Sequence, residues 1–139
     1  MKDTYTIAVD FDGTIGEDAY PDIGKPQLFA FDTLKKLQDK EYPNIYYSSK
    51  GLILWTYRYG KALDEAVAFC KENGITFYAV NKSFPEEDFD IKYSRKINAD
   101  LFIDDRNVGG LMGWGEIYQE LVGENAPLPK KKKKGWFGL

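Results

Sequence analysis

The stretch that decides the fold is Tyr5-Thr6-Ile7-Ala8-Val9-Asp10-Phe11-Asp12-Gly13-Thr14, in which an apolar run passes directly into two aspartates. The apolar half predicts a short buried strand. A second stretch has the same form, since Leu101-Phe102-Ile103 is followed by Asp104-Asp105. Buried carboxylates are costly unless they are paired, hydrogen-bonded or bound to a metal. Four carboxylates at the ends of two buried strands therefore predict a site for a hard cation such as Mg²⁺, which binds carboxylates, phosphate oxygens and water.

Predicted strands and helices alternate along the rest of the chain. Two more apolar runs, residues 52–55 and 76–80, predict strands, whereas residues 44–50 fit either a short strand or part of a long loop. A first helix is predicted between Pro26 and Pro43, with one apolar face formed by Leu28, Phe31, Leu34 and Leu37. A second helix is predicted before Gly74, with an apolar stripe of Leu63, Ala66, Val67 and Cys70, and a third over residues 114–122.

This alternation is typical of α/β proteins. It predicts a Rossmann-like three-layer α/β/α fold with a parallel sheet and helices on both faces. Ligands of such open sheets bind outside the carboxyl ends of the strands, near the point where the strand order reverses. Three predicted strands end at Asp10, Thr56 and Asp104, so we expect these side chains to converge.

Composition narrows the class of protein. A chain of 139 residues fits one domain, here residues 1–126, followed by a Lys-rich tail over residues 127–139. The single cysteine, Cys70, excludes an internal disulfide, and no apolar run is long enough for a membrane span. Together with the lack of a signal-peptide pattern, this predicts a cytoplasmic protein. The absence of histidine excludes His-dependent triads and most zinc sites.

Charge is concentrated at the C-terminal end. The net charge is -3, but Lys130 to Lys134 carry five of the 19 basic residues, which leaves 14 basic against 22 acidic residues, or -8. So acidic a body argues against a broad nucleic-acid-binding face. The tail is interpreted as a disordered appendage, whose only expected role is electrostatic contact with an anionic partner. Deleting residues 128–139 should leave folding and small-substrate turnover unchanged.

The motifs, in this order, resemble those of the haloacid dehalogenase-like (HAD) superfamily of phosphohydrolases. Asp10-Phe11-Asp12-Gly13-Thr14-Ile15 is similar to the first motif, Thr56 to the second and Asp104-Asp105 to the fourth. The third motif, a lysine, has two candidates, Lys92 and Lys96, of which Lys96 lies nearer the strand. The segment from Lys96 to Arg106 also resembles the small 5'(3')-deoxyribonucleotidases. The resemblance spans about residues 5–122 and implies a Mg²⁺-dependent phosphomonoester hydrolase.

Each candidate residue has a chemical role. Asp10 is the expected nucleophile, which forms an aspartyl-phosphate and splits hydrolysis into two steps. Asp12 would protonate the leaving oxygen and then accept a proton from water. Thr56 would donate a hydrogen bond to the phosphoryl group, and Lys96 would supply positive charge.

The remaining candidates hold the metal or the substrate. Mg²⁺ would be held by Asp10, Asp104 and a backbone carbonyl near Asp12, with Asp105 either a further metal ligand or the residue that orients Lys96. Four residues are candidate substrate contacts: Gly13, Thr14, Arg58 and Arg106. Arg58 and Arg106 fit equally a phosphate clamp and structural ion pairs. Trp55, Tyr57 and Tyr59 are interpreted as packing residues.

Two other functions compete with this one. A non-catalytic module would use the same residues only to bind Mg²⁺ or phosphate. A response-regulator receiver domain also uses aspartates, Thr and Lys, but it expects the acidic pair at the first strand rather than the last. The intervals after the first motif and after the third strand are too short for a cap domain, so an open site is expected. Such a site suits a nucleotide, a nucleic-acid end or a phosphoprotein, unless a second subunit covers it.

Overall fold

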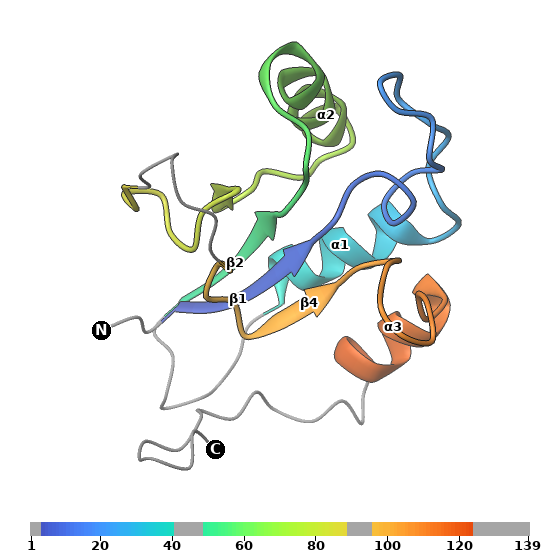
Figure 1. Cartoon of the computed structure of the whole chain (residues 1–139). Helices are drawn as coiled ribbons and strands as arrows, with labels where there is room; N and C mark the ends of the chain where they lie inside the picture. The colour runs from blue at the N-terminus through green and yellow to red at the C-terminus, as the bar shows by residue number, and fades with distance from the viewer. Residues whose placement is uncertain (1–3, 41–48, 89–95, 124–139) are drawn as a thin grey trace.

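The computed structural model describes residues 4–40, 49–88 and 96–123. Its sheet has four strands in the order β3-β2-β1-β4, and every neighbouring pair is parallel. Figure 1 shows the central strand β1 between β2 and β4, with their arrowheads pointing the same way. The elements along the chain are β1 (Thr4–Val9), α1 (Ala30–Asp39), β2 (Ser49–Leu54), α2 (Gly60–Glu72), β3 (Ala79–Val80), β4 (Leu101–Ile103) and α3 (Trp114–Leu121). The predicted parallel α/β fold is therefore confirmed.

The register of the strands separates two apolar clusters. Ile7 pairs with Leu52 and Val9 with Leu54, so these side chains share one face of the sheet. Residues of all three helices belong to the cluster on that face: Leu34, Leu37, Ala66, Cys70, Trp114 and Ile117. The cluster on the other face joins Ala8, Ile53 and Ala79 to Ile97 and Ala99. In the described part of the chain, that second face is covered by residues 96–100 rather than by a helix.

The first helix begins later than its apolar pattern predicts. Phe29, the residue before α1, has a left-handed backbone conformation with φ of 66°, which no α-helix can include. The helix therefore starts at Ala30, and the prediction that Leu28 lies on its buried face is wrong, because Leu28 is 76% exposed. Leu34 and Leu37 are buried as predicted. The third strand is also shorter than predicted, with only two residues.

The strand order places the reversal point between β1 and β4. From β1 the chain proceeds to β2 and β3 on one side, and β4 then returns to the opposite side of β1. Loops that leave neighbouring strands in opposite directions open a crevice at their carboxyl ends. Asp10 and Asp104 are the first residues after these two strands. The connections over residues 10–29 and 81–100 contain no helix or strand in their described parts.

Three predictions concern residues outside the described ranges. The tail at residues 127–139 and the segment Ile45-Tyr46-Tyr47 lie outside the described ranges, as does Lys92. Within those ranges, no helix is both long and apolar enough to cross a bilayer.

Candidate metal and phosphate site

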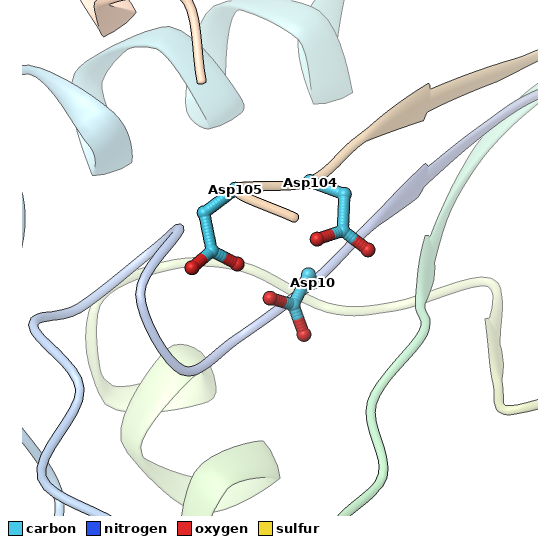
Figure 2. Close-up of side chains that lie close together, drawn as sticks. All are labelled: Asp10, Asp104 and Asp105. Atoms are coloured by element: carbon cyan, nitrogen blue, oxygen red, sulfur yellow. The ribbon is translucent and has the colours of Figure 1, made fainter. Parts of the chain in front are cut away.

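Three carboxylates meet at the crevice between β1 and β4. Asp10, Asp104 and Asp105 each offer an oxygen, and these oxygens lie within 4.8 Å of one another (Figure 2). The Asp10 amide donates a hydrogen bond to the carbonyl of Ile103 at 3.0 Å, which extends the parallel pairing of the two strands by one residue. The sheet itself therefore brings the carboxylates together, as their positions after two buried strands predict. Such an oxygen cluster suits a hard divalent cation.

Thr14 joins the two halves of this cluster. Its hydroxyl oxygen lies 3.1 Å from Asp10 Oδ2 and 3.2 Å from Asp105 Oδ1, and it accepts a hydrogen bond from the Asp105 amide at 3.0 Å. Thr14 is fully buried, and its carbonyl accepts a hydrogen bond from Trp114 Nε1 at 2.8 Å. We predicted Thr14 as a substrate contact; the structure instead gives it the role of positioning Asp10 against Asp105.

Gly13 is required by the close approach of Asp105. Its φ of +82° favours glycine, and a Cβ at this position would collide with the Asp105 carboxylate. The Gly13 amide donates to the carbonyl of Gly16 at 2.9 Å. The sharp turn expected at Gly13 is present and makes room for a carboxylate of the cluster, and the substrate contact of Gly13 stays a prediction.

The surroundings of Asp10 make its ionised form unfavourable. The pKa of Asp10 is raised from 3.8 to about 7, chiefly by burial and additionally by the hydrogen bond with Asp105 and the charge of Asp104. Adjacent carboxylates cannot all ionise cheaply in so small a space. A bound divalent cation would relieve this repulsion, so the chemistry of the three side chains fits Mg²⁺.

A measurement of stability against pH tests whether the pKa of Asp10 is raised. Between pH 3.8 and about 7 the folded state holds a proton on Asp10 that the unfolded chain has lost, so the free energy of unfolding should fall as pH rises through this range. The chain has no histidine to obscure the effect between pH 5 and 8. Urea unfolding in EDTA should show lower stability at pH 8 than at pH 5, and Mg²⁺ should stabilise more strongly at pH 8. A pH dependence that Asp10→Asn left unchanged would contradict the assignment to Asp10.

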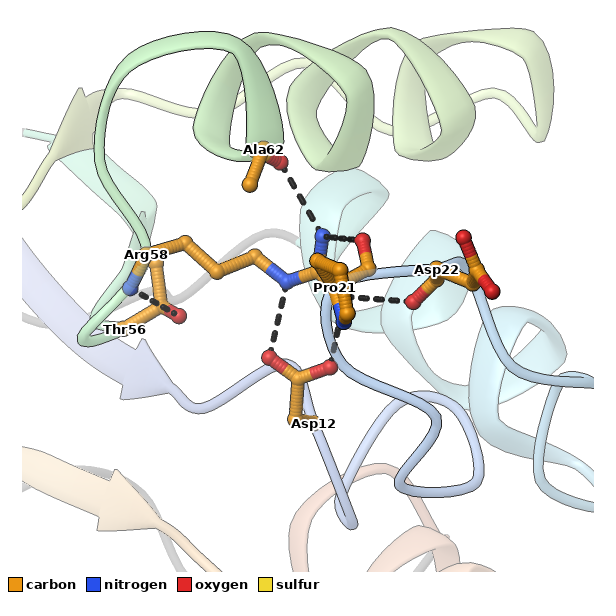
Figure 3. A network of polar contacts seen from close by, with 6 residues as sticks. All are labelled: Asp12, Pro21, Asp22, Thr56, Arg58 and Ala62. Atoms are coloured by element: carbon orange, nitrogen blue, oxygen red, sulfur yellow. Dashed lines mark hydrogen bonds and ion pairs between the residues drawn. The ribbon is translucent and has the colours of Figure 1, made fainter.

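Asp12 lies apart from the cluster, in a buried ion pair with Arg58. Both Asp12 oxygens accept hydrogen bonds from the guanidinium, from Nε at 2.8 Å and from Nη2 at 2.7 Å (Figure 3). Arg58 is 1% exposed, and the carboxylate raises the pKa of the guanidinium above its usual range. Of the two interpretations of Arg58, the structure supports the ion pair and not the substrate clamp. The Asp12 side chain is also separate from the three carboxylates grouped around the candidate metal position.

A cavity of about 350 Å³ connects the candidate catalytic residues. Its lining consists of Asp10, Asp12, Trp55, Thr56, Tyr57, Asp104 and Arg106. Thr56 accepts a hydrogen bond from the Arg58 amide at 3.1 Å, and its own O–H can donate to a phosphoryl oxygen in the cavity. Arg106 is the one predicted substrate-contact residue that lines this cavity. Asp10, Asp12, Thr56, Asp104 and Arg106 thus converge as expected.

Lys96 does not line this cavity. Its side chain is exposed, and its Nζ lies 5.0 Å from the centre of the Phe102 ring. The contact is favourable in itself, because a cation is attracted to the face of an aromatic ring. Among the described residues, Arg106 therefore supplies the cationic side chain of the cavity.

Sequence reasoning missed three contributors to the site, namely Asn81, Trp114 and Tyr57. Asn81 follows β3 and accepts a hydrogen bond from the Thr56 amide at 2.8 Å. The position of Asn81 at the end of a predicted strand was the one sign in the sequence that it could contribute to the site. Trp114 on α3 donates a hydrogen bond to the Thr14 carbonyl, and nothing in the sequence indicated this contact. Tyr57 and Tyr59 are 56% and 78% exposed, so their interpretation as packing residues is wrong, whereas Trp55 packs against the second apolar cluster.

Comparisons with known proteins give one informative match. A scan against models of protein families finds none that fits the chain, and a search of curated proteins finds none either. Among solved structures, a conserved protein from Bacteroides thetaiotaomicron matches with 50% sequence identity and a TM-score of 0.73, over 88% of this chain and 93% of that one. The chain belongs to the family of this Bacteroides protein. Shared architecture at this level of identity supports the parallel α/β fold described above.

Proposed function

We propose that the protein is a Mg²⁺-dependent phosphomonoester hydrolase of the HAD-like type, with Asp10 as the nucleophile. The observation that carries the proposal is the cavity that Asp10 shares with Asp12, Thr56, Asp104 and Arg106 at the reversal point of a parallel sheet. These groups supply a nucleophile, a proton acceptor, a hydroxyl donor and a cation around one space. The order of the motifs along the chain supports the same reaction class.

In the proposed reaction, an Asp10 oxygen attacks the phosphorus, the bond between phosphorus and the ester oxygen breaks, and this oxygen takes a proton from Asp12 to leave as the alcohol. Thr56 donates a hydrogen bond to the phosphoryl group, and the Arg106 guanidinium balances its negative charge. Water then attacks the aspartyl-phosphate, and phosphate leaves Asp10 as a free carboxylate. Mg²⁺, when held by Asp10, Asp104 and Asp105, would neutralise charge on the phosphoryl oxygens.

The contacts of Asp12 bear on its role in the two steps. Both Asp12 oxygens accept charge-assisted hydrogen bonds from the Arg58 guanidinium, which fixes the carboxyl group beside the cavity. In this position Asp12 can accept a proton from the attacking water in the second step. Donation of a proton to the leaving group in the first step requires this ion pair to loosen. Esters with good leaving groups, such as aryl phosphates, should therefore be the easier substrates.

A non-catalytic module that binds Mg²⁺ or phosphate is the second candidate. It is favoured by the position of Lys96, which lies against Phe102 rather than in the cavity. The two candidates differ in one measurable respect, because only the enzyme releases phosphate from a generic aryl phosphate.

The role of Asp104 provides the test of metal dependence. Turnover of an aryl phosphate should require Mg²⁺ and stop in EDTA. Asp104→Asn should raise the Mg²⁺ concentration needed for half-maximal activity by roughly 10- to 100-fold, because a carboxylate ligand is lost while the nucleophile remains. Asp64→Asn, an exposed aspartate on α2, is the matched control and should change nothing. An unchanged Mg²⁺ dependence in Asp104→Asn would contradict the metal role.

A further inference from the structure

Tyr57 occupies an unusual position for a large aromatic residue. It directly follows Thr56 and lines the cavity that contains Asp10 and Asp12, yet it is 56% exposed. Burial of its own ring therefore contributes little to folding. Tyr59, two residues later, is 78% exposed and does not line this cavity, so exposure alone does not place a tyrosine at the site.

A second tyrosine holds the Tyr57 ring. The rings of Tyr20 and Tyr57 are 5.0 Å apart between centres and inclined at 51°, a favourable arrangement for an aromatic pair. Tyr20 is itself 40% exposed, and the Arg58 guanidinium carbon lies 5.2 Å from the centre of its ring. The two tyrosines thus form an aromatic surface at the edge of the cavity that is supported from within by a buried cation.

Arg58, which supports this surface, is extensively hydrogen-bonded. Arg58 uses all five of its N–H donors: two bond Asp12, and the others bond the carbonyls of Pro21, Asp22 and Ala62 (Figure 3). The loop that carries Tyr20 is therefore attached to the side chain that also fixes Asp12. Because Arg58 contacts both features, it links the aromatic surface to Asp12.

We propose that Tyr57, supported by Tyr20, is a stacking platform that selects phosphate esters whose alcohol carries a planar unsaturated ring, such as a nucleobase. The proposal rests on the proposed function and names its substrate class. With the phosphoryl group at Asp10 and Arg106, the remainder of the ester extends along the same cavity toward Tyr57. Stacking of a base on an aromatic side chain strengthens binding by about 5- to 150-fold. An ester of an acyclic or saturated alcohol would gain no such contact.

The test compares two esters with the same leaving group. Adenosine 5'-monophosphate and ribose 5-phosphate are both esters of a primary ribose hydroxyl and differ by the base. The wild-type protein should prefer the first by about 5- to 150-fold in kcat/KM. Tyr57→Ala should bring the ratio close to one, Tyr57→Phe should retain most of it, and Tyr59→Ala should leave it unchanged. A wild-type ratio near one, or a ratio that Tyr57→Ala does not alter, would overturn the platform.

A second pair of esters isolates the ring from other features of a nucleotide. Benzyl phosphate and cyclohexylmethyl phosphate differ mainly in the flatness of the ring, so the platform should favour the benzyl ester. Equal turnover of these two would show that a base is recognised by other contacts, and would overturn stacking.

The experiments distinguish a failure of the proposed function from a failure of the stacking platform. Turnover of ribose 5-phosphate establishes hydrolysis without the platform. If no ester is hydrolysed, the proposed function fails, and titration calorimetry of the two ribose phosphates with the intact protein then tests the platform alone. Tighter binding of adenosine 5'-monophosphate that Tyr57→Ala removes would support it, whereas equal affinities would overturn it.

Discussion

Replacing Asp10 by Asn is expected to abolish turnover while leaving the fold intact. The amide has nearly the shape of the carboxylate but cannot attack phosphorus, so kcat should fall on the order of 10⁴-fold or more. Because burial, together with the neighbouring Asp105 and Asp104, raises the pKa of Asp10 to about 7, its neutral replacement should also stabilise the metal-free protein at pH 8. Phosphate release and urea unfolding of the same sample provide both measurements.

The control for this variant is Asp64→Asn, which changes an exposed aspartate on α2. It should have wild-type activity and stability. Substantial activity in Asp10→Asn, with its fold retained, would exclude Asp10 as the nucleophile. Loss of both activity and fold would instead show that Asp10 is needed for structure, in contradiction to the electrostatics of the cluster.

Replacing Arg58 by Met is expected to give the largest loss of stability. The change would leave the Asp12 carboxylate buried without its partner, and would remove hydrogen bonds to the carbonyls of Pro21, Asp22 and Ala62. Breaking one side of a buried ion pair costs about 3–5 kcal/mol. Denaturant unfolding should show this loss, together with reduced turnover, because Asp12 would no longer be fixed.

Two further variants separate the buried pair from a general effect of charge. Lys61→Met breaks a surface pair with Glu65, whose nitrogen and oxygen are 3.9 Å apart, and should leave stability almost unchanged. Adding Asp12→Asn to Arg58→Met should recover part of the loss, because the unpaired charge is removed. If Arg58→Met were no less stable than Lys61→Met, the structural role of the ion pair would be refuted.

The sheet and the carboxylate cluster were predictable because both follow from local sequence. Short apolar runs bounded by polar residues identify buried strands, and the carboxyl ends of parallel strands share one edge of the sheet. Asp10 and Asp104 therefore had to lie near each other if β1 and β4 were neighbours, as they are. Thr56, at the end of the next strand, was predictable for the same reason.

The features that could not be predicted depend on the paths of the loops. Whether Arg58 binds substrate or Asp12 depends on the path of residues 17–29, which brings the carbonyls of Pro21 and Asp22 to its guanidinium. The same path puts Phe29 in a left-handed conformation, so α1 begins only at Ala30. Leu28 therefore lies before the helix and is exposed. Periodicity describes helices and strands and contains no information on loop paths. The contacts of Thr14 and Gly13 with Asp105 could not be predicted, because Asp105 is more than 90 residues away in the sequence.

The central claim is that Asp10 becomes covalently phosphorylated, and trapping the phosphoenzyme tests it most directly. The protein would be mixed with an aryl phosphate and Mg²⁺, quenched in acid during turnover and reduced with borohydride, which converts an aspartyl-phosphate into homoserine. Mass spectrometry of the peptides should find homoserine at position 10 of the wild-type protein and none in Asp10→Asn. Homoserine at another aspartate, or turnover without any such product, would contradict the central claim.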